Sequence, residues 1–202
     1  MFKLSEFASS INTKGVLKTN KYNASFSIPA THYLSSELSQ EDARLFTIRC
    51  DSVQLPGVSL ASADGPPRLG YGPVEKHPYN ANFEDISLTL IVDANSRIHK
   101  MLYSWVNFIV NFRSSKGLTT AGGTTNSSAA YEVGYRDRYA VEMNIEVYKD
   151  SGQNTHDKSM TYKLYNAFPM GFPSNGLNWN EGDVLRLNIP FAYTDYSVEY
   201  HS

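Results

Sequence analysis

The 202-residue chain has little of several residue types that mark common protein classes. Cys50 is its only cysteine, which excludes an internal disulfide framework and a zinc site built on cysteines. Its 18 Lys and Arg residues are outnumbered by 20 Asp and Glu residues, and the formal net charge is -2. Proteins that bind the phosphate backbone of a nucleic acid usually have more basic than acidic residues. We therefore expect no stable nucleic-acid binding, although transient passage of DNA past the surface is compatible with this charge.

Long apolar runs are also missing. The opening residues, MFKLSEFASS, lack the apolar stretch of a secretory signal. The longest apolar stretch, residues 98–112, is interrupted by polar side chains such as Lys100 and Asn107, and it is too short to span a bilayer. We expect a soluble protein that is made in a reducing cytoplasm and has no membrane partner.

Motifs for catalysis and metal binding are missing as well. Nucleophile elbows, phosphate loops and dinucleotide fingerprints do not occur. The carboxylate pairs Glu84-Asp85 and Glu181 with Asp183 fit solvated positions better than a glycosidase pair, because neighbours on a strand face opposite ways. Helical metal spacing is absent among the histidines, which are His32, His77, His99, His156 and His201. We expect no enzyme activity, no metal and no cofactor.

The strongest structural signal is the block from Phe83 to Phe112. Apolar residues first alternate, which predicts a strand from Phe83 to Val92. The spacing then changes to three and four, which predicts one amphipathic helix over about residues 96–112. Its apolar stripe comprises Ile98, Met101, Leu102, Trp105, Phe108, Ile109 and Phe112. We interpret this stripe as core packing and not as a cofactor site.

The remaining patterns predict mostly strands. A short N-terminal helix capped by Ser5 comes first. Cys50 lies in a predicted strand and is expected to be a buried apolar residue. Pro190 indicates an edge position or a bulge in the last strand. The predicted strands are Tyr22–Ile28, Leu45–Val53, Phe83–Val92, Tyr139–Val147, Met160–Phe168 and Leu185–Tyr193. We predict a mainly β (α+β) fold, an antiparallel sandwich or barrel of about six to seven strands with the helix packed on it.

Residues 1–202 are expected to form a single domain from which an arm, 61–80, and a long loop, 113–136, extend. Residues 61–80 are rich in Gly and Pro, which favours an extended arm or loop over a core strand, because proline cannot donate to a strand ladder. The loop has too little apolar surface to order itself, so we expect a partner to order both segments. Candidate inter-subunit contacts are Arg68, Tyr71, Lys116, Tyr131, Tyr196 and Tyr200. The abundant aromatic residues, 14 Tyr and 10 Phe, fit either assembly contacts or a glycan-binding surface.

The order of these elements resembles a known family. The chain starts with MFKLSEF and the strand YNASFSI, and its centre reads LTLIVDANSRIHKMLYSWVNFI. It ends with LYNAFPMGFPSNGLNW, the acidic turn NEGD and the strand LRLNIPFAY, and Leu55-Pro56 follows an early strand. Together these stretches are similar to the tail-tube proteins of contractile-tailed bacteriophages, in particular the baseplate protein that initiates the tube.

This resemblance implies a structural protein of the virion tail, made in the host cytoplasm. It implies rings, six-membered in the family, whose joined sheets line the channel for genome ejection. The implied partners are further copies, adjacent rings, baseplate hub or initiator proteins, and the sheath. Whether the chain is the tube initiator or the repeated tube subunit stays open.

Two further alternatives follow from the residues. Glu142 and Glu146 lie on the outer face of a predicted strand, and they are candidates for lumen-facing charges that repel DNA phosphates. An ordinary solvated strand face explains them equally well. The alternative function is a carbohydrate- or receptor-binding β-sandwich of a phage appendage.

Overall fold

The computed structural model describes residues 3–28, 35, 38–65, 70, 74–110, 133–150, 157–179 and 182–201. Its helices are α1 (Leu4–Lys14), α2 (Gln40–Arg49), α3 (Arg97–Ile109) and α4 (Arg136–Tyr139). Its strands are β1 (Tyr22–Ser27), β2 (Cys50–Val53), β3 (Val58–Gly65), β4 (Glu75–Phe83), β5 (Ile86–Ile91), β6 (Val141–Tyr148), β7 (Lys158–Pro169), β8 (Arg186–Ala192) and β9 (Asp195–Tyr200). The mainly β fold predicted from the sequence is confirmed.

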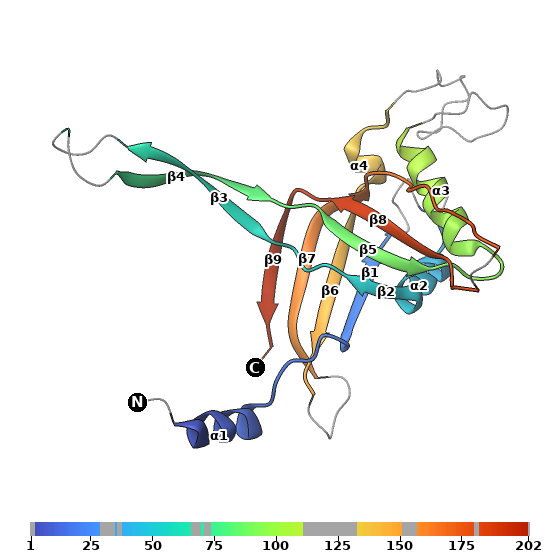
Figure 1. Cartoon of the computed structure of the whole chain (residues 1–202). Coiled ribbons are helices and arrows are strands. Elements are labelled where there is room, and N and C mark those ends of the chain that lie inside the picture. Colours follow the sequence, from blue (N-terminus) through green and yellow to red (C-terminus); the bar gives the residue numbers. More distant parts are fainter. Residues whose placement is uncertain are drawn as a thin grey trace.

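A seven-stranded sheet forms the body, in the order β1-β6-β7-β8-β5-β2, with β9 added beside β7. All its neighbouring strands are antiparallel. The long strand β7 pairs with β9 up to Tyr165 and with β8 only through Phe168 and Pro169. The strands therefore separate into a layer of β1, β6, β7 and β9 and a layer of β8, β5 and β2, which cross in Figure 1. The Tyr22 hydroxyl donates to the carbonyl of Asp51 and so links the outer strands β1 and β2.

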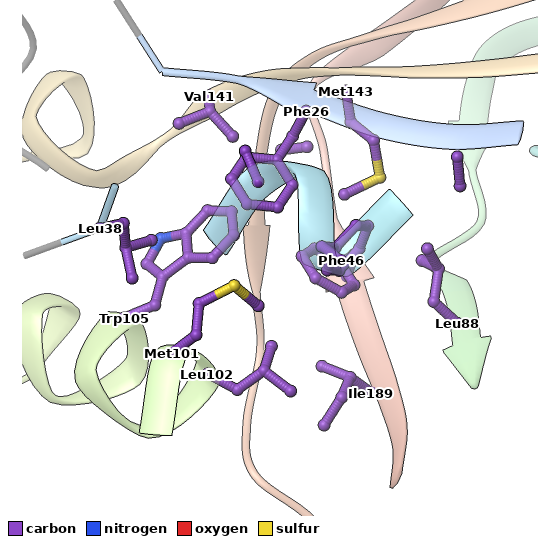
Figure 2. Close-up of a cluster of buried hydrophobic side chains, with 14 of the residues drawn as sticks. Phe26, Leu38, Phe46, Leu88, Met101, Leu102, Trp105, Val141, Met143 and Ile189 are labelled. Carbon is purple, nitrogen blue, oxygen red and sulfur yellow. The ribbon is translucent and has the colours of Figure 1, made fainter. Parts of the chain in front are cut away.

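Helix α3 lies against these strands as its apolar stripe predicts. The Asp93 carboxylate accepts a hydrogen bond from the Ile98 amide at 3.1 Å, which holds the first turn. Trp105 is fully buried, and its indole N–H donates to the carbonyl of Tyr139 at 3.0 Å. In Figure 2 its ring lies beside Phe26, and the ring centroids are 5.2 Å apart. Each such buried side chain contributes roughly 1.5–3 kcal/mol, which is enough to fix the helix on the sheet.

The strand predicted over Leu45–Val53 is wrong in its first half, because Gln40–Arg49 is the helix α2. Ser39 and Asp42 form a capping box: the Asp42 amide donates to the Ser39 hydroxyl, and the Asp42 carboxylate accepts from the Ser39 amide. Ala43 and Phe46, three residues apart, are buried on one side of the helix. Cys50 is therefore only half-buried at the start of β2, contrary to the expectation of a buried cysteine.

Smaller corrections concern the ends of elements. Helix α1 begins after Lys3 without a side-chain cap, so the predicted cap at Ser5 is wrong. Phe83 ends β4 and does not begin β5, and Tyr139 belongs to α4. Helix α3 ends at Ile109, after which Val110 pairs with Val133.

Pro190 occupies neither an edge strand nor a bulge. It pairs with Ser87 in an unbroken register between β8 and β5. The Ser87 carbonyl accepts from Gln54, on the side away from β8, and the Pro190 carbonyl accepts from Met170, on the side away from β5. Pro190 and Ser87 therefore form a non-hydrogen-bonded pair, and the missing N–H removes no bond between β5 and β8.

The arm is a two-stranded antiparallel sheet of β3 and β4, which pair with each other and take no part in the seven-stranded sheet. Pro78 is accommodated next to a shift in register between Ala61 and Ser62. The pair begins at Val58 and projects away from the body in Figure 1. Arg68 and Tyr71 lie outside the described residues, as do Lys116 and Tyr131 of the predicted loop.

Candidate assembly surfaces

One face of the layer β1-β6-β7-β9 is polar throughout, and we call it the polar face. The register aligns Asn23, Glu146, Thr161 and Glu199 in one row across the four strands. The opposite face carries the core residues, because successive side chains of a strand alternate. The polar face comprises Asn23, Ser25, Ser27, Glu142, Asn144, Glu146, Tyr148, Lys158, Thr161, Lys163, Tyr165, Asp195, Ser197 and Glu199.

The two predicted lumen-facing carboxylates share this face but differ in environment. Glu142 is exposed. The Glu146 side chain is only 16% exposed, and it forms an ion pair with Lys158 and accepts from the Tyr148 hydroxyl at 2.7 Å. Burial raises the pKa of Glu146, but the hydrogen bonds from Lys158 and Tyr148 outweigh it, and the net pKa lies below its ordinary value. Glu146 is thus an ionised and internally paired group, whereas Glu142 presents its charge to solvent.

The polar face is bounded by an edge strand that sequence reasoning missed. β9 pairs with β7 and with no other described strand, although the last predicted strand ended at Tyr193. The alternation of Tyr196, Val198 and Tyr200 could have identified it. Tyr200 is 80% exposed, while Tyr196 is half-buried. An unpaired strand edge is a template for another strand, so β9 is a candidate contact surface.

The arm exposes apolar side chains that nothing in the described chain covers. Leu60 is 67% exposed and Tyr79 is 72% exposed. Every residue of β4 is exposed. An isolated pair of strands is marginally stable in water, and exposed apolar clusters mark interaction sites. The arm is therefore a second candidate contact surface.

Two other segments of the described chain also expose apolar side chains. Leu177 and Trp179, between β7 and β8, are 87% and 103% exposed. The helix α1 lies apart from the body in Figure 1, and Leu4 on it is 76% exposed. Asp150 forms ion pairs with Lys18 and Lys21 in the segment that follows α1. The hydrogen bonds of Lys18 and Lys21 lower the pKa of Asp150 to about 2.

The described part of the chain contains no arrangement that fits a metal site. His, Cys, Asp and Glu residues do not gather there into a group that could hold a metal ion. Within the same residues, none of the helices has the length and apolar character needed to cross a membrane. The features that stand out are an open strand edge, a polar sheet face and an apolar arm, which are features of assembly.

Comparison with known proteins identifies the family. The model of the phage tail tube protein family matches residues 17–199. The chain belongs to the phage tail tube protein family. The match extends from the segment before β1 to β9, so it includes the body, the arm and the polar face. The resemblance read from the sequence is confirmed, and the chain is a structural tail tube protein.

Solved structures share this family's fold at low sequence identity. One is from the sheath–tube complex of an extracellular contractile injection system, PVC, in the extended state; it is 16% identical, covers 100% of both chains and has a TM-score of 0.57. Another is from the six-fold symmetrised baseplate of the anti-feeding prophage; it is 12% identical, covers 92% of this chain and 96% of that chain, and has a TM-score of 0.59.

A third similar structure is from the tube-terminating cap of the anti-feeding prophage. It is 11% identical, covers 92% of each chain and has a TM-score of 0.57. No curated protein sequence matches this chain significantly. At these identities, the solved structures show the fold alone.

Proposed function

We propose that this tail tube protein assembles into six-membered rings whose polar faces line a channel for genome ejection. The observation that carries the proposal is the position of the polar face, which occupies one side of a four-stranded layer and ends at the open strand β9. If the layers of neighbouring copies join, their polar faces form one continuous lining. A ring closes such a head-to-tail contact by symmetry and leaves no edge free.

The backbone of β9 defines how a neighbouring strand would pair. The amide of His201 donates to the carbonyl of Ser159 on β7. Since backbone groups alternate in direction along a strand, the amides of Glu199 and Ser197 also face β7, whereas the amide of Val198 faces the open edge. The number six is taken from the family resemblance, and the fold shared with a six-fold symmetrised baseplate supports it.

The charge of the polar face supports passage of DNA. Its carboxylates Glu142, Glu146, Asp195 and Glu199 exceed its amines, and Glu199 and Glu146 are paired with Lys163 and Lys158. A weakly acidic lining repels phosphates, so DNA slides past it without binding. Glu142 carries this role in our proposal, because Glu146 is already engaged within the chain.

The arm and two tyrosines of β9 supply the remaining contacts. We assign Tyr196 and Tyr200 on β9 to contacts between neighbours in a ring, and the apolar arm to contacts with the next ring. Further partners are the baseplate hub or initiator proteins and the sheath. The chain acts either as the tube initiator at the baseplate or as the repeated subunit, and these two positions differ in the surface that each end of the ring meets.

Negative-stain electron microscopy of purified protein tests the assembly directly. Rings or tubes are expected for the native chain. Val198→Pro removes the edge-facing N–H while retaining the bonds to β7, so we expect a folded chain by circular dichroism that forms no rings. Val198→Thr keeps the N–H and is the matched control. Discrete particles that bind glycans would instead favour the receptor-binding alternative, and normal rings from Val198→Pro would reject β9 as the joining edge.

A further inference from the structure

Four aromatic rings meet where the arm leaves the body, and we call them the base cluster: Phe83, Tyr162, Tyr193 and Tyr196. The ring of Phe83, at the end of β4, lies edge-on to Tyr196 with centroids 5.7 Å apart and to Tyr193 with centroids 6.4 Å apart. Tyr196 also contacts Tyr193 at 6.2 Å and Tyr162 of β7 at 6.1 Å. The cluster thus joins the arm to the edge of the polar layer.

A hydrogen bond reinforces the same junction. The hydroxyl of Tyr193 donates to the carbonyl of Glu84 at 2.7 Å, in the two-residue link between β4 and β5. The pKa of Tyr193 is raised to about 12, mainly by burial and then by the nearby Tyr196, Asp85 and Glu84. The hydroxyl therefore stays protonated, and remains a donor, throughout the physiological range.

Tyr196 occupies a special position in this cluster. Like Val198, it has a backbone amide that faces the open edge of β9, because the alternate residues Ser197 and Glu199 face β7. Its ring meanwhile lies against Phe83 at the base of the arm. One residue is therefore shared by the edge that would pair with a neighbour and by the support of the arm.

Small changes at this base have large effects at the far end of the arm. With a rise of about 3.4 Å per residue in an antiparallel strand, β4 extends roughly 27 Å from Phe83 to Glu75. A tilt of about 10° at the base therefore moves the far end by about 5 Å, which equals the spacing between paired strands. A neighbour that recognises the arm would lose its register after such a tilt.

We propose that Tyr193 and Tyr196 are positioning residues that fix the direction of the arm relative to the edge strand β9. This proposal rests on the proposed function. A neighbour that pairs with β9 restrains the backbone of Tyr196, and the ring of Tyr196 packs against Phe83 at the base of the arm. The arm is thereby oriented toward the next ring. Ring closure and ring stacking are coupled through the base cluster.

The distance between two spin labels tests the positioning in the monomer, where assembly plays no part. Cys50→Ala removes the native thiol, and Lys76→Cys on the arm with Ser27→Cys on β1 supplies the two label positions. We expect a narrow distance distribution for the otherwise native chain, a broad one for Tyr196→Ala, and an intermediate one for Tyr193→Phe, which removes only the hydroxyl. Tyr196→Phe keeps the ring and should retain the narrow distribution.

Tyr79→Ala is the matched control, because Tyr79 is 72% exposed on the arm and lies outside the cluster. It should leave the distribution narrow. Unchanged distributions in both Tyr196→Ala and Tyr193→Phe would overturn the proposal, and Tyr193→Phe decides it alone if Tyr196→Ala does not fold. Microscopy separates this result from the proposed function: we expect Tyr193→Phe, a change outside β9, to form rings that stack less often, whereas absence of rings from the native chain would reject the ring itself.

Discussion

The helix α3 and the arm of β3 and β4 differ in the burial of their apolar side chains. Trp105 on α3 is fully buried, and its N–H is paired with a carbonyl of the same chain. Leu60 and Tyr79 on the arm are largely exposed. The body therefore obtains its stability from its own packing, whereas the arm has apolar surface that the other described residues leave exposed. The difference separates residues needed for folding from residues needed for assembly.

The largest expected difference is in the stability lost when a buried or an exposed tryptophan is replaced. Trp105→Ala should lower the free energy of unfolding by about 3–5 kcal/mol, because it leaves a cavity and an unpaired carbonyl in the core. Trp179→Ala is the matched control, since that ring is fully exposed, and it should change stability by less than about 0.5 kcal/mol. Chemical denaturation of both monomers measures the difference, and equal losses would contradict it.

The arm should show the reverse behaviour. Leu60→Ser is expected to alter the free energy of unfolding of the monomer by less than about 0.5 kcal/mol, because the side chain is already in water. It should nevertheless reduce tube formation in electron micrographs. Leu177→Ser serves as a control, because Leu177 is also exposed but lies outside the arm.

Hydrogen exchange tests whether assembly orders the arm. Amides of β3 and β4 should exchange quickly in the monomer and slowly in assembled tubes, while amides of α3 should be protected in both states. Equal protection of the arm in the two states would show that it needs no partner.

A charge change on the polar face has a smaller, purely functional effect. Glu142→Lys should leave stability and ring formation intact, because the side chain is exposed, but it should lower DNA ejection by attracting phosphates. Glu142→Gln removes the charge without reversing it and should have a weaker effect. Phage infectivity and ejection assays measure both, and normal ejection by Glu142→Lys would reject this face as the lining.

The smallest expected effect is the pH dependence of the segment after α1. The pKa of Asp150 is lowered from 3.8 to about 2 by Lys18 and Lys21, so the ion pairs are fully formed above about pH 4. Their contribution should disappear as the pH falls through about 2. Carboxyl resonances in an NMR titration follow this directly. Lys18→Met with Lys21→Met should return the midpoint toward 3.8, and an unchanged midpoint would show that the lysines are not the cause.

The long apolar stripe predicted its helix well, whereas a short local cap signal and the relations between elements were missed. The stripe from Ile98 to Ile109 identified α3, because burial follows directly from helical spacing. Leu45 and Phe46 were wrongly placed in a strand, because the cap formed by Ser39 and Asp42 decides that segment. Four of the predicted contact residues, Arg68, Tyr71, Lys116 and Tyr131, lie outside the described residues, so their roles remain proposals.

The mainly β class, the amphipathic helix and the family follow from the sequence alone, because periodicity and order of elements are properties of the chain. Which strand edge stays unpaired and which side chains share a face depend on the tertiary structure. The pairing of β9 with β7 creates the open edge, and the register across the layer gathers Glu142, Lys163 and their neighbours on one face. Strand pairing and register join residues far apart in the sequence, and the spacing within one strand does not show which strand lies beside it.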